Sequence, residues 1–484
     1  MDTILDCYTD EPAGLGVPPY LGTYPRYLYG YLGQANYLTI DDLRFLNYYG
    51  LNKEKKEISH KTNIKIFNLT KNISRIKEIL SSTERLFVIL GVHTPGKYLS
   101  AIPGTLEEVS ELIRDIPCEK ILTGPAIFGT QLEGGKFFEK VDDNIFKKKE
   151  NQDFSYDEIS DYAIKGTDLT DQIPDLRIAE IETGHGCPRK KGCSFCTEPI
   201  KHRLEFRKNQ DILKEVKALY SKGIKHFRLG KQSDFYMHPD SISLLKEIRA
   251  SCPDINVLHI DNVNPESVIS EKGEEITKAI VKYCTEGNIA AFGVESFDPV
   301  VCKENNLNSD PKTSYSAVKL LNKFGSERGE NGMPKFLPGI NILFGLKGEA
   351  KSTHQENMGW LKRILDEDLL LRRINIRQVT IFQGTQLYQE CGSKYLKKNK
   401  KFYWKWRNDI RQNIDLPMLG KIVPKGSILK DVRAEIYDGN TTFARQVGTY
   451  PLIVGIKRRL ELNRFYDVKI TEHMLRSVTA EVSK

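Results

Sequence analysis

The stretch IETGHGCPRKKGCSFC, residues 181–196, decides the fold of the central part of the chain, because it joins an apolar segment to a loop with closely spaced cysteines. These cysteines are Cys187, Cys193 and Cys196, with the spacing C-x5-C-x2-C. Three thiolates on one glycine-rich loop can wrap a metal centre, but they do not supply a fourth protein ligand. The loop is therefore a candidate metal site.

Two kinds of metal centre fit three cysteines. A zinc ion would take its fourth ligand from His185 or His202, whereas an iron–sulfur cluster would leave one iron open. A zinc site needs four tetrahedral ligands, and no second pair of cysteines follows in the sequence. An open iron suits an amino-carboxylate chelator, such as the methionine end of S-adenosylmethionine, so the pattern favours an iron–sulfur cluster.

From residue 177 onward, apolar strand candidates alternate with helical patterns. Strands are expected at residues 177–183, 225–229, 256–260, 289–293, 339–344 and 374–382. Six strand–helix units between residues 177 and 392 fit a partial (β/α)6 barrel, whose chemistry is expected at the carboxyl ends of the strands.

The rest of the chain divides into three parts. In residues 1–130, strand and helix patterns alternate, which predicts an α/β domain with a doubly wound, Rossmann-like parallel sheet. Residues 131–176 are charged and lack apolar periodicity, which predicts a linker or excursion. Residues 393–484 begin with a lysine-rich aromatic segment and continue with strand-like segments, so we expect a small, mostly-β C-terminal substrate-binding domain.

Composition excludes several classes of protein. With 484 residues, a net charge of +8 and 39% hydrophobic residues, the chain is neither disordered nor fibrous. It has no apolar stretch of membrane-spanning length, and its acidic N-terminus lacks the order of a signal peptide. We therefore expect a soluble cytoplasmic protein, in which the six cysteines outside the loop are small buried residues.

Residues 177 to about 390 resemble a radical S-adenosylmethionine enzyme. The resemblance rests on the cysteine loop, on the aromatic Phe195 before its last cysteine, and on three later motifs in the family's order. These motifs are GVES (Gly293–Ser296), NILFGLKGE (Asn341–Glu349) and IFQGTQL (Ile381–Leu387). Two features depart from the family pattern: the first cysteine gap has five residues rather than three, and LGKQSDF (Leu229–Phe235) lacks the Gly-Gly-Glu motif.

The resemblance implies a [4Fe-4S] cluster on the three cysteines, with S-adenosylmethionine at its open iron. The residues implied for the ribose and methionine are Gly293, Glu295 and Ser296. The residues implied beside the adenine are Phe195, Gly345 and Gly384. The resemblance assigns no catalytic residue.

The first domain resembles the cobalamin-binding domain of the cobalamin-dependent (class B) branch of this family. The resemblance rests on the segments Asp10–Leu32, Val92–Thr105 and Thr123–Thr130. It implies that cobalamin is bound by His93, Thr94, Gly124 and Pro125. A glycine and a proline would let the backbone approach a large flat ligand, although the same two residues could simply close a tight strand-to-helix turn. The D-x-H-x-x-G motif that ligates cobalt in mutases is absent.

Together these resemblances imply a methyltransferase that acts on an unactivated carbon. One molecule of S-adenosylmethionine would supply the methyl group through cobalamin, and a second would be cleaved reductively to a 5'-deoxyadenosyl radical. An external electron donor would be needed. The layout is similar to archaeal enzymes that C-methylate methyl-coenzyme M reductase, in particular the glutamine C-methyltransferase, so we expect a protein substrate.

A nucleic-acid partner is left open by the C-terminal region. Lysines, arginines and aromatic residues interleave over residues 395–411, which suits either phosphate and base contacts or an amphipathic segment packed on the barrel. The alternative function is an RNA-modifying radical enzyme such as a methylthiotransferase, which would carry three further cysteines where this chain has only Cys7 and Cys118. The third alternative is a noncatalytic nucleic-acid-binding or metal-sensing protein.

Overall fold

The computed structural model describes residues 1–8, 21–49, 67–91, 102–132 and 137–483. The chain divides into two compact units. Unit 1 comprises Met1–Ile181 and Gln210–Phe227, and unit 2 comprises Glu182–Asn209 and Arg228–Lys484. Both units contain helices and strands, so the expected α/β class is confirmed. Among the described helices, none is both long and apolar enough to cross a membrane.

Unit 1 is built on a five-stranded sheet in which every strand pair is parallel. The strands follow the order β2 (Asn36–Thr39), β1 (Asp2–Asp6), β3 (Arg85–Ile89), β4 (Glu119–Thr123) and β7 (Lys148–Lys149). The order of the sheet reverses between β1 and β3, which is the doubly wound order 2-1-3-4-5. In sheets of this kind, ligands bind at the carboxyl ends of the strands next to that point.

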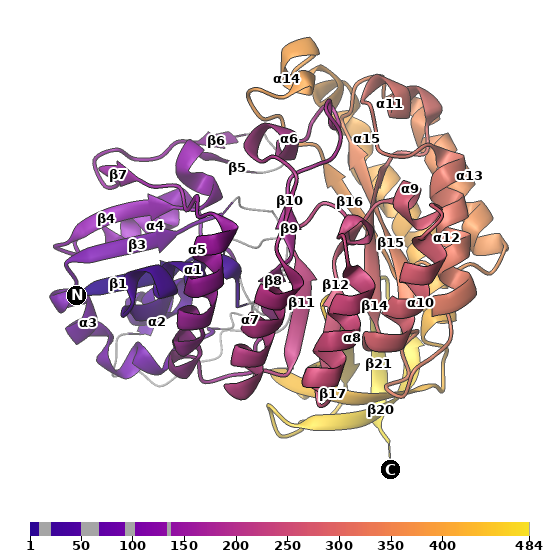
Figure 1. The fold of residues 1–484 in the computed structure, drawn as a ribbon. Coiled ribbons are helices and arrows are strands. Elements are labelled where there is room, and N and C mark those ends of the chain that lie inside the picture. Colours follow the sequence, from indigo (N-terminus) through magenta and orange to yellow (C-terminus); the bar gives the residue numbers. More distant parts are fainter. Residues whose placement is uncertain (9–20, 50–66, 92–101, 133–136, 484) are drawn as a thin grey trace. The chain divides into compact units, whose positions relative to one another are not determined.

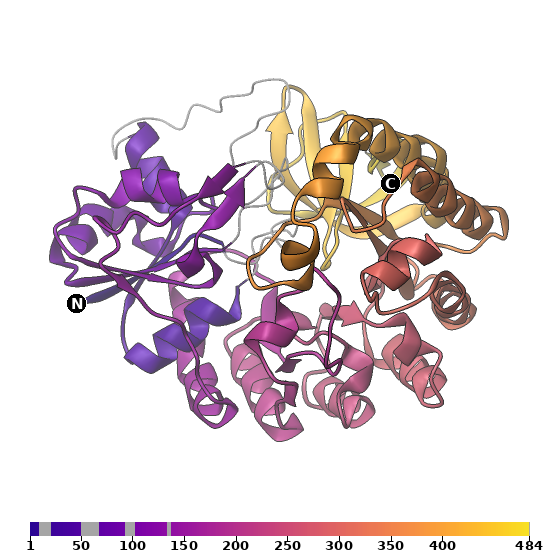
Figure 2. The same ribbon diagram turned by 90° about the horizontal axis from the view of Figure 1, so that it is seen from above.

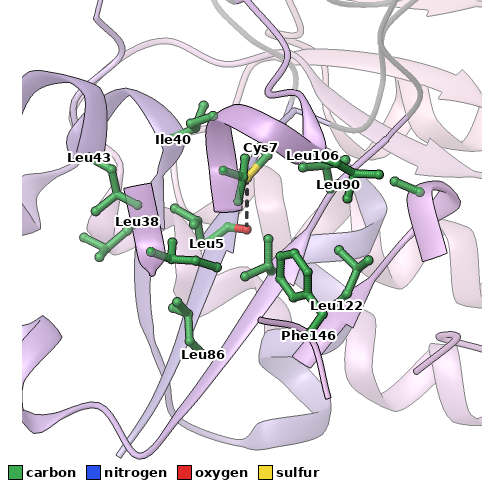
Figure 3. Close-up of a cluster of buried hydrophobic side chains, with 14 of the residues drawn as sticks. Leu5, Cys7, Leu38, Ile40, Leu43, Leu86, Leu90, Leu106, Leu122 and Phe146 are labelled. Carbon is green, nitrogen blue, oxygen red and sulfur yellow. Dashed lines mark hydrogen bonds between the residues drawn. The ribbon is translucent and has the colours of Figure 1, made fainter. Parts of the chain in front are cut away.

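Both faces of this sheet are apolar because helices cover both. On one face, Leu5, Leu38, Leu86 and Leu122 pack with residues of three helices, as Figure 3 shows for part of the cluster. These helices are α2 (Ile40–Tyr49), α3 (Ile76–Ser82) and α4 (Leu106–Ile113). On the other face, the neighbouring strand residues pack against α1 (Thr23–Leu32).

Residues 131–176 are not a linker. They form the hairpin of β5 (Thr130–Leu132) and β6 (Phe137–Glu139), then β7, then α5 (Tyr156–Lys165) and the 3-10 helix η5 (Gly166–Gln172). Helix α5 begins at a capping box formed by Ser155 and Glu158 and packs on α1. The prediction failed because the charged outer face of α5 hides a short apolar stripe, Tyr156, Ile159 and Ala163.

Unit 2 begins within the central strands, since the division between the units passes through β8 (Ala179–Glu182) and β11 (His226–Gly230). These strands form a three-stranded sheet of order β12-β11-β8 with β12 (Val257–Ile260). A parallel four-stranded sheet follows, of order β13 (Asn262–Val263), β14 (Asn288–Glu295), β15 (Phe336–Phe344) and β16 (Arg373–Gln378). The six strands expected between residues 177 and 382 correspond to β8, β11, β12, β14, β15 and β16.

Helices cover the outer side of these strands in unit 2, as the two views in Figures 1 and 2 show. They are α8 (Ser241–Ser251), α10 (Gly273–Tyr283), α12 (Pro311–Gly325) and α13 (Lys351–Asp366). Each connects one strand to the next, which is the arrangement of a parallel barrel.

The C-terminal region is not mostly β throughout. Its first part is helical, with α15 (Lys394–Ile410), the π-helix η7 (Arg411–Asp415) and α16 (Leu416–Ile422). The lysine-rich segment forms a helix because Asn399, Trp406 and Ile410 recur on one buried face. A closed barrel of order β17-β18-β19-β21-β20 follows, with parallel β19 and β21. Its strands are β17 (Ile428–Asp438), β18 (Thr441–Gln446), β19 (Leu452–Ile456), β20 (Phe465–His473) and β21 (Ser477–Val482), in the strand order of an OB-fold.

Candidate functional site

The strands β14, β15 and β16 of unit 2 have two different faces. Along β14, Phe292 and Val294 are buried, whereas Ala291, Gly293 and Glu295 are only partly buried. Strands β15 and β16 alternate in the same way, with partly buried residues at Asn341, Leu343, Arg373, Asn375 and Arg377. Side chains alternate along a strand, so the buried set faces the helices and the partly buried set shares the opposite face, which we call the inner face. Barrel interiors are usually filled by branched apolar side chains, so polar groups here mark a candidate site.

The cysteine loop follows β8 and the short strand β9 (Gly184–His185), which pairs with β10 (Glu205–Phe206). Gly186 has a φ of +81°, and a Cβ built on it would lie 2.2 Å from the carbonyl oxygen of Arg203. Any side chain at this position would therefore clash with backbone, so the glycine fixes the path of the chain into Cys187.

Two asparagines outside the loop hold it in place. The Asn305 Oδ1 accepts a hydrogen bond from Ser194 Oγ at 2.8 Å, and the Asn306 Nδ2 donates to the carbonyl oxygens of Lys191 and Gly192, each at 2.9 Å. Asn305 is fully buried. Sequence reasoning missed both residues, because nothing in their local pattern shows that they reach the cysteines. They are positioning residues for the loop.

Two thiols of the loop, those of Cys193 and Cys196, resist ionisation. Burial and the nearby Glu295 carboxyl raise the pKa of Cys193 to about 12, against the lowering effect of Arg189. Burial likewise raises the pKa of Cys196. The Arg189 Nη1 donates to the Cys193 Sγ at 3.5 Å. Metal centres bind thiolates, so a cationic cluster would offset the cost of ionising these sulfurs, and the donor set of three cysteines fits one.

The histidines beside the loop are engaged elsewhere. His185 Nδ1 lies 3.3 Å from Glu182 Oε1, and His202 Nδ1 lies 3.1 Å from Glu198 Oε1. Within the described ranges, no three His, Cys, Asp or Glu side chains converge as the ligands of one metal ion do. His185 and His202 thus each already contact a carboxylate.

Glu295 is the most unusual residue of the inner face. Its φ is +60°, a conformation that non-glycine residues rarely adopt, and it lies at an irregularity in the pairing of β14 with β15. Among the described residues, its buried Oε2 has no hydrogen-bond partner. Burial raises the pKa of Glu295 to about 8, against the lowering effect of Arg377. Strained backbone and an unpaired carboxyl with a raised pKa make Glu295 a candidate functional residue.

Comparisons with known proteins identify the domain that contains the cysteine loop. Residues 181–358 match the model of the Radical SAM superfamily. An uncharacterized protein of Methanocaldococcus jannaschii is 42% identical over 99% of this chain and 92% of its own length. The chain belongs to the same family as this protein, and it contains a radical SAM domain.

Two further likenesses are more distant. The solved structure of the radical S-adenosylmethionine methyltransferase TsrM from Kitasatospora setae, with cobalamin and a [4Fe-4S] cluster bound, has a TM-score of 0.50. It is 14% identical and covers 80% of this chain and 76% of its own, so it shows a shared fold. The ribosomal protein uS12 methylthiotransferase RimO of Clostridioides difficile is 25% identical over 39% of this chain and 40% of its own length.

The residues predicted to contact S-adenosylmethionine in the radical SAM domain do not all share one face. Gly293 lies on the inner face beside Glu295, whose Oε1 would be 3.2 Å from a Cβ at Gly293. Ser296 is buried, lies 3.4 Å from the Asn357 side chain of α13 and accepts a hydrogen bond from the Asp298 N–H at 3.1 Å. The Ser296 side chain thus caps a turn behind the strand.

The glycines and the aromatic residue predicted beside the adenine have different surroundings. Gly345 has a φ of +97°, and a Cβ there would lie 2.9 Å from Leu396 of α15. Gly384 has a φ of +84° with open space where a Cβ would be. Phe195 packs against a small apolar cluster that includes Leu346 and Leu387. Close packing therefore already requires a glycine at position 345, whereas Gly384 is exposed and has no close neighbour.

The residues predicted to bind cobalamin lie in unit 1. Gly124 has a φ of +89°, and a Cβ there would lie 2.8 Å from the Leu90 carbonyl oxygen. Pro125 opens the 3-10 helix η3 (Pro125–Phe128), whose Ala126 N–H donates to the same oxygen at 3.0 Å. These two residues form a tight turn after β4. His93 and Thr94 lie outside the described residues.

Proposed function

We propose that this chain is a cobalamin-dependent radical S-adenosylmethionine methyltransferase. The observation that carries the proposal is the cysteine loop beside the strained, unpaired carboxyl of Glu295 in the radical SAM domain. Cys187, Cys193 and Cys196 would hold a [4Fe-4S] cluster, which supplies the electron that cleaves S-adenosylmethionine. Three cysteines would suffice because S-adenosylmethionine itself would bind the remaining iron.

Each protein residue of the site then has a definite role. Glu295, whose pKa is about 8, holds a proton at neutral pH and can hydrogen-bond a ribose hydroxyl without adding a buried negative charge. Arg189 places positive charge at the Cys193 sulfur. The absence of a side chain at Gly293 and the open space at Gly384 leave room for the nucleoside.

Cobalamin binding is assigned to unit 1. Support comes from its doubly wound sheet, since ligands of such sheets bind at the carboxyl ends of the strands, where Gly124 and Pro125 follow β4. The TsrM structure, which has a similar fold, is described as binding cobalamin. His93 and Thr94 complete the proposed set of cobalamin contacts.

The proposed substrate is a protein residue with an unactivated carbon. Its finer form, C-methylation of a glutamine of methyl-coenzyme M reductase, rests on the resemblance of the sequence to the enzymes of that type. An external electron donor is required in either case.

The test is anaerobic reconstitution with iron, sulfide and hydroxocobalamin, followed by desalting and incubation with S-adenosylmethionine and dithionite. We expect retained iron and cobalamin, formation of 5'-deoxyadenosine, and addition of one methyl group to a glutamine-containing peptide of methyl-coenzyme M reductase. Bound iron with no cleavage product would contradict the radical chemistry, and a failure to retain cobalamin would contradict the role of unit 1.

A second candidate, an RNA-modifying methylthiotransferase, is favoured by the closed C-terminal barrel, because OB-type barrels often bind oligonucleotides. Two observations weigh against it. Of the two cysteines in residues 1–130, Cys7 is fully buried in the core of unit 1. In α15, Trp406 is buried and stacks on Phe402 and His354, which leaves Trp404 exposed. Fewer aromatic rings are thus free to stack on bases than the sequence suggested.

A further inference from the structure

Five arginines of unit 2 gather at the β16 edge of the inner face. This arginine group consists of Arg372, Arg373, Arg377, Arg411 and Arg476. The first three lie at β16, Arg411 begins η7, and Arg476 lies between β20 and β21 of the C-terminal barrel. Because strand residues two apart share a face, Arg373 and Arg377 both lie on the inner face, in line with Asn375.

One tyrosine of the C-terminal barrel connects part of this group. The Arg372 Nη2 donates to the Tyr450 carbonyl oxygen at 2.9 Å, and the Arg373 Cζ lies 4.6 Å from the centroid of the Tyr450 ring. The Tyr450 hydroxyl donates to Asp261 Oδ1 at 3.0 Å. The Arg372 guanidinium is therefore held by a backbone contact and that of Arg373 by stacking, rather than by acids.

Nearby carboxylates neutralise the group only in part. Asp415 pairs with Arg411 and also acts on Arg372, Arg373 and Arg476, whereas Asp261 pairs with Arg228. In the part of the chain that the structure describes, Arg372, Arg373, Arg377 and Arg476 form no ion pair, and the buried Nε atoms of Arg372 and Arg373 lack hydrogen-bond partners. Glu295, the remaining acid of the inner face, holds its proton up to a pKa of about 8.

The arginines also act on one another. Burial lowers the pKa of Arg373, against the raising effect of Tyr450, and with the help of Arg377, Arg372 and Arg411 the pKa reaches about 10. Burial and Arg476 lower the pKa of Arg372 to about 10 against the raising effect of Asp415. Like charges that are partly removed from water and balanced by a single carboxylate destabilise the folded protein. A bound anion would remove this cost.

We propose that the arginine group binds an oxyanion, a carboxylate or phosphate group, that the substrate carries. Guanidinium forks bind either oxyanion through paired N–H donors, and several of these donors are free here. Arg377 lies close enough to Glu295 to influence its ionisation, so the anion would be placed on the same face as the proposed S-adenosylmethionine site. That the substrate carries this anion rests on the proposed function. That the arginine group binds an anion does not.

The test is thermal unfolding of the full chain in phosphate, glutarate or chloride at equal ionic strength. We expect inorganic phosphate or glutarate to raise the Tm by on the order of 3 °C over chloride. Arg373→Gln and Arg377→Gln should abolish that rise. In chloride, the Tm of each variant should equal or exceed that of the unaltered protein, because each substitution removes a repelling charge. The matched control is Arg464→Gln, an exposed arginine of the same unit paired with Glu461, which should keep the full rise.

Each outcome decides the proposal. A rise in phosphate alone identifies a phosphate ligand, and a rise in glutarate alone identifies a carboxylate. A Tm that does not distinguish the three anions, or a rise that survives in both variants, overturns the proposal. Since the assay needs neither cluster nor S-adenosylmethionine, anion binding in a protein that fails to cleave S-adenosylmethionine would overturn the proposed function alone.

Discussion

Replacing Asn305 by alanine tests whether the cysteine loop depends on side chains outside the loop. Its buried amide makes four hydrogen bonds. Oδ1 accepts from Ser194 Oγ at 2.8 Å and from the Lys347 N–H at 3.2 Å, and Nδ2 donates to the Val301 and Lys347 carbonyl oxygens, each at 2.8 Å. Asn305→Ala removes all of them. At a net contribution near 1 kcal/mol per bond, the free energy of unfolding should fall by about 3–4 kcal/mol.

The matched control is Asn322→Ala. Asn322 is also buried, donates to the Val318 and Leu370 carbonyl oxygens at 2.9 and 3.1 Å, and accepts from the Leu370 N–H at 2.7 Å. By the same reasoning, Asn322→Ala should lower the free energy of unfolding by about 2–3 kcal/mol. Asn322 belongs to α12, and none of these three hydrogen bonds involves the cysteine loop.

The assay has two readouts, urea unfolding of the protein without cluster and iron content after anaerobic reconstitution and desalting. We expect both variants to lose stability, but only Asn305→Ala to lose iron, because only Asn305 supports Ser194 next to Cys193. Equal iron retention in the two variants would refute the reasoning, and so would equal iron loss.

The remaining predictions concern the site itself. Cys193→Ala should abolish both the brown colour and S-adenosylmethionine cleavage, since two thiolates cannot hold the cluster; a variant that still cleaves would contradict the assignment. Gly186→Ala should prevent cluster incorporation, because the added Cβ would lie 2.2 Å from the Arg203 carbonyl oxygen. Its control is Gly426→Ala, where φ is +87° and no atom lies within 4 Å of the added Cβ. This control should lower the free energy of unfolding by only about 1 kcal/mol through backbone strain. Burial raises the pKa of Glu295 from 4.5 to about 8, so folded protein keeps a proton that the unfolded chain releases, and stability should fall as the pH rises from about 5 to about 8. The measurement is the difference in the free energy of unfolding between pH 5 and pH 8, which Glu295→Gln should reduce by on the order of 3–4 kcal/mol. An unchanged difference would show that the Glu295 carboxyl ionises normally.

Local patterns were sufficient where the chemistry lies close together in the sequence. The cysteine spacing, the apolar strand patterns of residues 289–293 and 339–344, and the acid of the GVES motif all depend on neighbours within a few residues. The same reasoning missed α5, whose short apolar stripe is hidden in a charged segment. For residues 395–411 it left two interpretations open, nucleic-acid contacts or an amphipathic segment, and α15 has the buried face that an amphipathic helix requires.

The sequence by itself determined the alternation of strands and helices, the three cysteines of one loop and the position of Glu295 at the end of a strand. Only the tertiary structure decided which distant groups support or surround that loop. Asn305 and Asn306 reach back more than a hundred residues to the cysteines, and Arg476 joins arginines of β16 from a different barrel. The physical reason is that hydrogen bonds and charges act across space at distances of a few ångströms, whereas sequence patterns record only the periodicity of the backbone that carries them.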